Sequence, residues 1–312
     1  MQQASLRIFR ALSYDFDKHS DIQNVKGVEG IIESVKRNPK KFDIMENACL
    51  ILQNFLSNEE RRQETIDLVT SLNVIPVVID GMYYSHKDFL AAACGLLANL
   101  AMDEDAKTVI SDYALSTKTL LAVLEECTGI DADVAISTLT VLRLLLTKNQ
   151  EYKRKIAEGG GIKTVTDFLT APQEVIVAES ALRLLAEMVN NSVDNAEQLK
   201  ACGGIKFVTS LMKGKPRSSA LQALGCRILC SLATSAHPSK GVSAHPIQIE
   251  EAEEALKLVL SMMKSHTNSN SVQLDGSQAL VHLCSVFPTL TASLDPSILC
   301  ESTYCFSLKS SH

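Results

Sequence analysis

The spacing of apolar and polar positions predicts helices along most of this chain, and the segment Ala91–Ala101 shows the pattern most clearly. Its apolar side chains recur at steps of three and four residues, which places them on one stripe of a helix that must be buried. These positions are Ala93, Leu96, Leu97 and Leu100. Asn99 falls outside the stripe. A short turn and a second apolar run follow, so the unit is a helical hairpin too small to bury its apolar face alone.

The same pattern returns at a steady interval. The matching segments are Ser5–Ser13, Ala48–Ser57, Ala93–Ala101, Thr138–Leu146, Ala181–Val189 and Gly225–Ala233. Their equivalent apolar positions are Ile8, Ile51, Leu96, Val141, Leu184 and Ile228, separated by 43, 45, 45, 43 and 44 residues. A period in this range is typical of armadillo and HEAT arrays.

A second set of motifs runs in phase with the first. It comprises Gly27-Val28, Ile75-Pro76, Gly160-Gly161-Ile162 and Gly203-Gly204-Ile205. With these turns and the ANLA and QNFL segments, the sequence resembles the armadillo repeat family, whose units have a short first helix, a glycine bend, a second helix and a longer third helix. A sharp bend needs positive φ or close backbone approach, and HEAT repeats lack it. The resemblance implies an all-α, right-handed armadillo-type α-solenoid, a superhelix of stacked helical repeats.

The pattern also predicts the organisation of the chain. We expect armadillo repeats over 1-236 with the first one incomplete, an inserted loop over 237-249, a degenerate C-terminal repeat over 250-290 and an irregular or disordered tail over 291-312. Helices are predicted at Glu250–Lys264 and around Gly276–Val286, separated by a SHTNSNS loop. In the unit around Asp112–Glu126, Ser116 and Thr117 replace the Gly-Ile pair. Because the chain starts inside a third helix, we expect it to be a fragment of a longer protein.

Composition narrows the function classes. The net charge of −6 argues against a general nucleic-acid binder, whose footprint would be basic. Most of the nine cysteines lie in or beside apolar helical patterns, where a free thiol behaves as a small hydrophobe, so a reducing cytoplasmic location is expected. The KRNPKK segment at Lys36–Lys41 leaves the nucleus as an alternative. The longest apolar runs are too short for a membrane span.

Motifs of catalysis are missing from the sequence. It contains no P-loop, GxSxG, HExxH or strand-linked GxGxxG pattern, and Gly159–Gly161 fits an inter-helix bend better than a phosphate loop. Cys226, Cys230, His282 and Cys284 have no CxxC spacing, so buried thiols are favoured over zinc. We therefore expect a protein without enzymatic activity, cofactor or bound metal.

The third helices offer the candidate binding surface. The armadillo resemblance implies a concave groove with a ladder of asparagines that hold the main chain of an extended peptide. The ladder positions here are Ala11, Asn54, Asn99, Leu144, Glu187 and Ser231. In importin-α, a Trp four residues earlier forms slots for lysine; here those positions are Arg7, Leu50, Gly95, Thr140, Arg183 and Arg227, and the chain has no Trp.

The absent Trp array argues against recognition of basic nuclear-import signals. Instead Arg143, Arg183 and Arg227 would favour an acidic or phosphorylated peptide. The alternative is that Arg183 pairs with Glu179 and Glu187 at helical spacing.

The sequence thus predicts a protein–protein interaction scaffold that binds a partner segment along the third-helix groove. The expected groove residues are Leu50, Asn54, Gly95, Asn99, Arg143, Arg183, Glu187 and Arg227. Two alternatives stay open: a regulator that binds a folded partner, such as a small GTPase or cytoskeletal subunit, and the repeat part of a larger enzyme such as a ubiquitin ligase.

Overall fold

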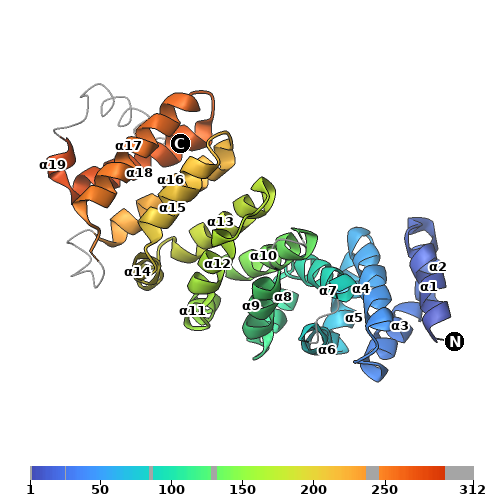
Figure 1. Ribbon diagram of the computed structural model, residues 1–312. Helices are drawn as coiled ribbons and strands as arrows, with labels where there is room; N and C mark the ends of the chain where they lie inside the picture. The colour runs from blue at the N-terminus through green and yellow to red at the C-terminus, as the bar shows by residue number, and fades with distance from the viewer. Residues whose placement is uncertain (1, 25, 84–86, 128–131, 237–245, 292–312) are drawn as a thin grey trace. The chain divides into compact units, whose positions relative to one another are not determined.

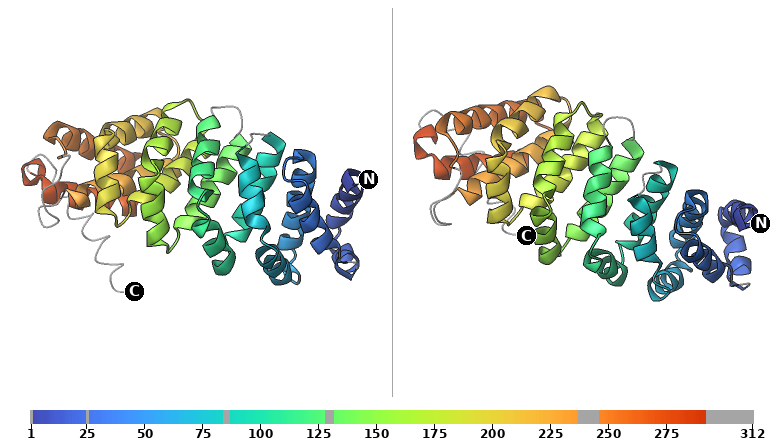
Figure 2. Two further views of the ribbon diagram at one scale, coloured as in Figure 1. Left: turned by 90° about the horizontal axis from the view of Figure 1, so that it is seen from below. Right: turned by 60° about the horizontal axis from the view of Figure 1, so that its bottom comes forward.

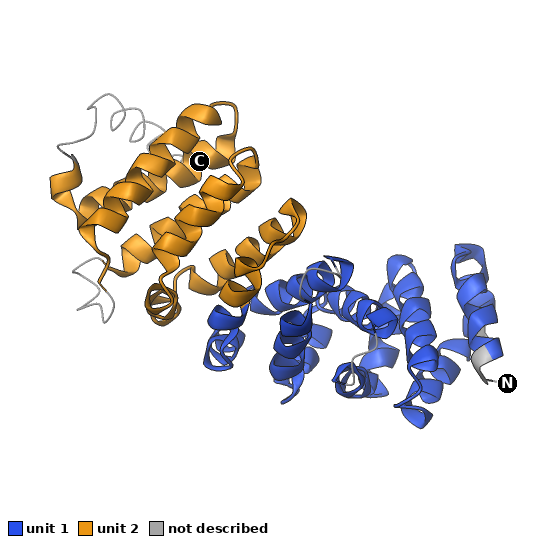
Figure 3. Ribbon diagram, in the orientation of Figure 1, with its two compact units in different colours: residues 1–164 blue, residues 165–312 orange. Residues whose placement is uncertain are grey.

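The computed structural model describes residues 2–24, 26–83, 87–127, 132–236 and 246–291, and these residues form helices and connecting turns with no strand (Figure 1). The chain divides into two compact units, residues 1–164 and 165–312 (Figure 3). The division falls inside one helix, α12 (Gly161–Thr170). The boundaries expected from the sequence at 236, 249 and 290 stay predictions.

Third helices form where the repeated pattern places them. In the first unit they are α1 (Gln2–Ser13), α4 (Phe42–Ser57), α7 (Lys87–Leu100) and α10 (Ala132–Leu146); in the second they are α13 (Val175–Val189), α16 (Ser219–Ser235) and α18 (Asn270–Val286). Each of the six matched segments lies in one of these helices, apart from Ala101, which follows the end of α7. The predicted all-α armadillo arrangement is confirmed.

Shorter helices complete each repeat. The first helices are α2 (His19–Asn24), α5 (Arg62–Ser71), α8 (Glu104–Asp112), α11 (Gln150–Glu158) and α14 (Val193–Ala201). The second helices are α3 (Gly27–Arg37), α6 (Val74–Met82), α9 (Ser116–Glu126), α12, α15 (Gly204–Gly214) and α17 (Ile249–Ser265). A short 3-10 turn η1 (Phe16–Lys18) and a four-residue helix α19 (Pro288–Thr291) are the remaining elements.

Neighbouring third helices pack through the predicted apolar stripe. In the first unit α1 contacts α4, α4 contacts α7 and α7 contacts α10. The helices α4, α7 and α10 run side by side (Figure 2). Ile51 and Val141 are 0% exposed and Leu96 is 1% exposed. Ile8 has the same register on α1 but is 62% exposed, because no described third helix covers its side of α1. Packing between repeats, not within one repeat, therefore buries the stripe.

Bends with positive φ precede four of the second helices, and glycine occupies two of them, Gly160 and Gly203. The residue before α15 is Gly203 with φ of 71°, and the residue before α6 is Asn73 with φ of 53°. The residue after Gly203 has no room for a side chain, because a Cβ on Gly204 would lie 2.7 Å from the Leu199 carbonyl oxygen. The unit that lacks the Gly-Ile pair bends differently, since Leu115 before α9 has φ of −90°.

Basic side chains of the first helices stabilise the C-terminal ends of the third helices in the same repeat. Arg62 Nη2 of α5 donates to the Asn99 carbonyl oxygen at 3.2 Å, and Lys107 Nζ of α8 lies 3.4 Å from the Thr147 carbonyl oxygen. The last carbonyls of a helix have no partner within the helix and carry its negative dipole end, so a cation there is favourable. Positions 62 and 107 are one 45-residue repeat apart.

The second unit repeats this packing. α16 contacts α13 and α18, and α17 contacts α15 and α18. The predicted 237–249 loop lies mainly, and the 291–312 tail almost wholly, outside the described residues. The SHTNSNS loop was predicted too long: α18 begins at Asn270, because Ser269 Oγ accepts a hydrogen bond from the Val272 amide at 3.4 Å.

Among the described helices, none is long and apolar enough on its own to cross a membrane. The α5–α6 pair meets that test of length and composition only when its two helices, bent by 77°, are taken together.

Candidate functional site

The candidate site is the set of half-buried and exposed side chains along the third helices, which we call the third-helix surface. In the first unit Leu50, Asn54, Gly95, Asn99 and Arg143 belong to it, on α4, α7 and α10. Since these helices pack side by side in a common register, the five positions share one surface. Arg183, Glu187 and Arg227 lie on α13 and α16 of the second unit.

The two ladder asparagines differ in how much of their hydrogen-bonding capacity is used. Asn54 Nδ2 donates to Ser13 Oγ at 2.8 Å, so part of that amide is bound within the protein. The half-buried Asn99 side chain makes no hydrogen bond in the described part of the chain, although its carbonyl oxygen accepts from Arg62. An asparagine amide has two donors and an acceptor, so Asn99 keeps its whole capacity for a ligand.

The space beside Gly95 is filled by a side chain of the neighbouring third helix, α4. Gln53 of α4 donates through Nε2 to the Ala92 carbonyl oxygen at 2.8 Å. A Cβ on Gly95 would lie 2.6 Å from Gln53 Oε1. The Gln53 amide therefore fills the place that a larger residue at position 95 would need. The sequence pattern did not reveal this role of Gln53, because the contact joins two repeats.

The three arginines predicted to bind an acidic segment, Arg143, Arg183 and Arg227, have different surroundings. Arg143 is half-buried and Arg183 is exposed, and neither forms an ion pair with a described residue. The expected alternative for Arg183, a pair with Glu179 and Glu187, is not formed; Glu179 instead accepts a hydrogen bond from Ser218 Oγ at 2.5 Å.

Arg227 is the arginine that does form an ion pair. Its Nη2 lies 3.1 Å from Asp275 Oδ2 on α18, and the Asp275 side chain is only 6% exposed. The buried carboxylate needs this cation, so Arg227 also holds α16 and α18 together. Asp275 lies 48 residues further along the chain, and no local pattern links it to Arg227.

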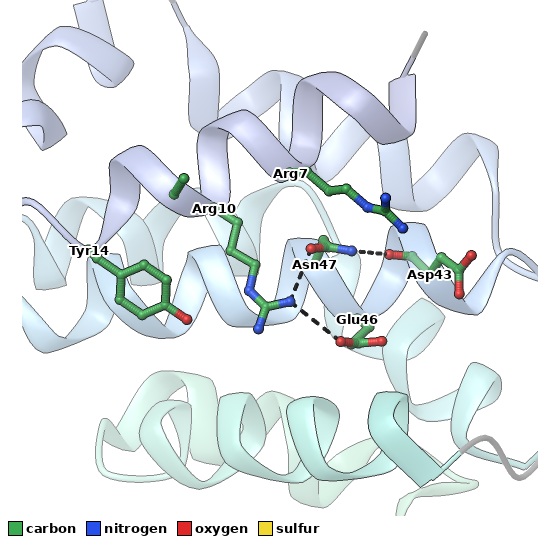
Figure 4. Close-up of a pocket in the computed structure, with 7 residues that line it drawn as sticks. Arg7, Arg10, Tyr14, Asp43, Glu46 and Asn47 are labelled. Atoms are coloured by element: carbon green, nitrogen blue, oxygen red, sulfur yellow. Dashed lines mark hydrogen bonds and ion pairs between the residues drawn. The ribbon is translucent and has the colours of Figure 1, made fainter.

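A pocket of about 410 Å³ opens on the third-helix surface between α1 and α4 (Figure 4). It is lined by Arg7, Arg10, Ala11, Tyr14, Asp43, Glu46 and Asn47. Arg7 and Ala11 occupy the positions of the first repeat that correspond to the Trp and Asn positions of the armadillo ladder. These two positions, identified from the repeat pattern, therefore line a pocket in the structure.

Charges inside this α1–α4 pocket are largely balanced. Arg10 Nη1 lies 3.6 Å from Glu46 Oε1 and donates to Asn47 Oδ1 at 3.3 Å (Figure 4). Asn47 Nδ2 in turn donates to the Asp43 carbonyl oxygen at 2.6 Å. Arg7 makes no ion pair with a described residue and is exposed. The pocket can thus offer one unpaired guanidinium to a ligand.

The described cysteines are free thiols, most of them buried. Burial raises the pKa of Cys94 and of Cys226 to about 12, so both stay protonated at neutral pH. The described residues contain no group of three or more His, Cys, Asp or Glu side chains that could hold a metal ion.

Basic side chains of the KRNPKK segment and of α11 make local ion pairs. Lys36 and Arg37 both pair with Glu33, and Arg154 pairs with Glu151 at 2.7 Å. These exposed pairs stabilise helices modestly.

No protein-family model matches the chain, and no curated protein sequence matches it. Solved structures do match. An engineered protein superposes with a TM-score of 0.72 at 17% identity, covering 96% of this chain and 67% of the other. Computationally designed armadillo repeat proteins for modular peptide recognition reach 0.65 at 14% identity, covering 82% and 99%. A designed armadillo repeat protein in complex with the peptide (KR)4 gives 0.63 at 14% identity, also covering 82% and 99%.

Similarity at these identities concerns the fold. Together with the helix order and the positive-φ bends, it defines the class: this chain has an armadillo-type α-solenoid fold.

Proposed function

We propose that this chain is a non-enzymatic binding scaffold that holds an extended segment of a partner protein on its third-helix surface. The observation that carries the proposal is Asn99, a half-buried amide whose side chain has no hydrogen-bond partner among the described residues. A half-buried amide gains most from a partner when a ligand covers it. The use of this fold for peptide recognition in designed armadillo proteins supports the same use here.

The main chain of the segment is the natural ligand for the ladder amides. Asn99 can accept from a peptide N–H through Oδ1 and donate to a peptide carbonyl through Nδ2. Asn54 keeps Oδ1 and one N–H for the same task, since its other N–H is bound to Ser13. Such contacts hold any extended sequence, so selectivity must come from neighbouring side chains.

We assign that selectivity to Arg143 and Arg183, and the preferred segment is acidic or phosphorylated. A guanidinium without an ion pair can donate two parallel hydrogen bonds to a carboxylate or phosphate. Arg227 contributes less, because Asp275 already compensates its charge. The designed relative binds the basic peptide (KR)4, whereas this chain has no Trp with which to form lysine slots.

Fluorescence anisotropy with labelled decapeptides tests the proposal. We expect an alternating Asp-Glu peptide and a phosphoserine peptide to bind more tightly than (KR)4, and their binding to weaken as salt is raised. The combined variant Asn54→Ala, Asn99→Ala, Arg183→Glu should lose at least tenfold in affinity. Arg217→Glu, an exposed position between α15 and α16, makes the same charge change away from the third-helix surface and should bind normally.

Equal binding by the combined variant and the unmodified chain would refute the groove model. If a whole partner protein bound and no peptide competed with it, recognition of a folded surface would be favoured instead.

A further inference from the structure

One side of α1 is open to solvent, although its residues belong to the apolar stripe of the third helices. Ile8, at the centre of this side, is 62% exposed, and Leu12, one helical turn later, is 40% exposed. Ala4, Ser5 and Ala11 lie on the same side of the helix and are exposed as well. We call these residues the α1 face. None of them carries a charge, so the face can bury apolar surface without removing an ion from water.

The equivalent stripe is covered in each of the other described third helices. The residues that correspond to Ile8 are Ile51, Leu96, Val141, Leu184, Ile228 and Ala279. Those that correspond to Leu12 are Phe55, Leu100, Leu145, Met188, Leu232 and Leu283. All twelve are at most 1% exposed. Among the described third helices, α1 alone therefore has this stripe open.

The contacts inside the first unit show which kind of surface covers such a stripe. Third helices pack on one another in a row, α1 on α4, α4 on α7 and α7 on α10 (Figure 2). α1 uses its opposite side for this contact, since Leu6 is 3% and Ser13 is 0% exposed, and Ser13 Oγ accepts from Asn54 Nδ2 at 2.8 Å. The α1 face thus continues an existing row of interfaces, and another third helix with an open stripe is the surface that fits it.

A second copy of this chain supplies that surface through its own α1 face. Identical faces that meet about a two-fold axis give a closed dimer, whereas head-to-tail contacts give open chains of molecules. A head-to-tail contact would place α1 against the last described third helix, α18, which has no exposed large hydrophobic side chain. The α1 face therefore favours the closed arrangement.

We propose that two copies of this chain associate through their α1 faces to form a two-fold symmetric dimer. Tyr14 and Phe16, directly after α1, are 64% and 52% exposed and add apolar surface at the same end of the unit. A helix of 12 residues is only about 18 Å long, so the contact is smaller than a standard interface of about 1,200–2,000 Å². The dimer should accordingly be weak, with a dissociation constant on the order of 10 µM.

The dimer has a consequence that rests on the proposed function. It would carry two third-helix surfaces in one particle and could hold two segments of a multivalent partner, which raises the effective affinity without any new contact. Self-association itself needs no peptide, so it can be measured separately from peptide binding.

Sedimentation equilibrium of the full chain, from micromolar to hundreds of micromolar and without peptide, tests the proposal. We expect the average mass to rise with concentration from one copy to two and no further. Ile8→Glu places a carboxylate from each copy in the contact and should weaken dimerisation at least tenfold, and Leu12→Glu should act in the same direction. Ile176→Glu, at a 59% exposed position on α13, makes the same change elsewhere and should dimerise normally.

Added salt distinguishes this contact from peptide binding. An apolar contact should persist at high salt, whereas binding of an acidic peptide should weaken. Circular dichroism of Ile8→Glu should match the unmodified chain, because the replaced side chain is largely exposed in a single copy.

Three results would overturn the proposal: the mass of one copy at every concentration, growth beyond two copies, or undiminished dimerisation in both Ile8→Glu and Leu12→Glu. The first of these would favour another occupant of the α1 face, such as a third helix of a different repeat protein.

Discussion

The contact between Gly95 and Gln53 leads to a quantitative prediction. Alanine is favoured over glycine inside a helix by about 0.5–1 kcal/mol, so Gly95→Ala alone would be expected to stabilise α7. The new Cβ would, however, lie 2.6 Å from Gln53 Oε1. Gln53 must then rotate away and lose its hydrogen bond to the Ala92 carbonyl oxygen, which is worth about 1 kcal/mol. The two effects offset each other, and we expect a net change near zero.

A double-mutant cycle separates the two effects. In a Gln53→Ala background the hydrogen bond is already absent, so Gly95→Ala should stabilise the protein by its full helix-propensity gain of about 0.5–1 kcal/mol. The coupling energy between the two positions should therefore be about 1 kcal/mol.

Native-state hydrogen exchange of the α7 amides is the appropriate assay, because repeat arrays can open unit by unit and exchange reports each unit separately. Equilibrium unfolding in guanidinium chloride, followed by circular dichroism, gives the global value for the same four proteins. If Gly95→Ala stabilised α7 equally with and without Gln53, the proposed contact between the two side chains would be refuted.

Three further predictions follow from the described contacts. Gly204→Ala should destabilise the protein by about 1–3 kcal/mol because its Cβ meets a backbone carbonyl, whereas Gly214→Ala, with open space around it, should be neutral or slightly stabilising in the same unfolding assay. Arg227→Met should cost about 1–2 kcal/mol by leaving the Asp275 carboxylate without its cation, and adding Asp275→Asn should recover part of that loss; no recovery would argue against the ion pair. Because burial raises the pKa of Cys94 to about 12, its thiolate forms only in the unfolded chain between about pH 8.5 and 12. Cys94 should therefore not change stability with pH below that window, and within it should contribute a fall of about 1.4 kcal/mol per pH unit, in addition to the falls from other buried thiols such as Cys226. Cys94→Ala should make this fall shallower, and an unchanged slope would contradict the assignment.

The repeats could be predicted from the sequence because their cause is local. A 43- to 45-residue period of apolar stripes determines which residues each third helix must bury. The aligned segments that close at Ser13, Ser57, Leu146 and Val189 coincide with the ends of α1, α4, α10 and α13. The glycine bends were equally visible, since positive φ limits the residue choice. The position of the third-helix surface follows from both patterns.

Side-chain contacts between helices that are far apart in the sequence could not be predicted in the same way. The Gln53 amide beside Gly95, the Arg227–Asp275 ion pair and the capping of Asn99 by Arg62 join residues 37 to 48 positions apart. Each depends on side-chain reach across a helix interface, which the period does not encode.

The sequence by itself determined the fold class, the helix register and the polar positions that lie outside the apolar stripe of each third helix, because hydrophobic periodicity and backbone sterics act within a single repeat. The tertiary structure decided which of those positions remain available. It leaves Asn99, Arg143 and Arg183 without side-chain partners among the described residues, binds Asn54 and Arg227 to their neighbours, and leaves the apolar stripe of α1 open. The physical reason is that a polar side chain becomes a binding group only when packing leaves its donors and acceptors unused.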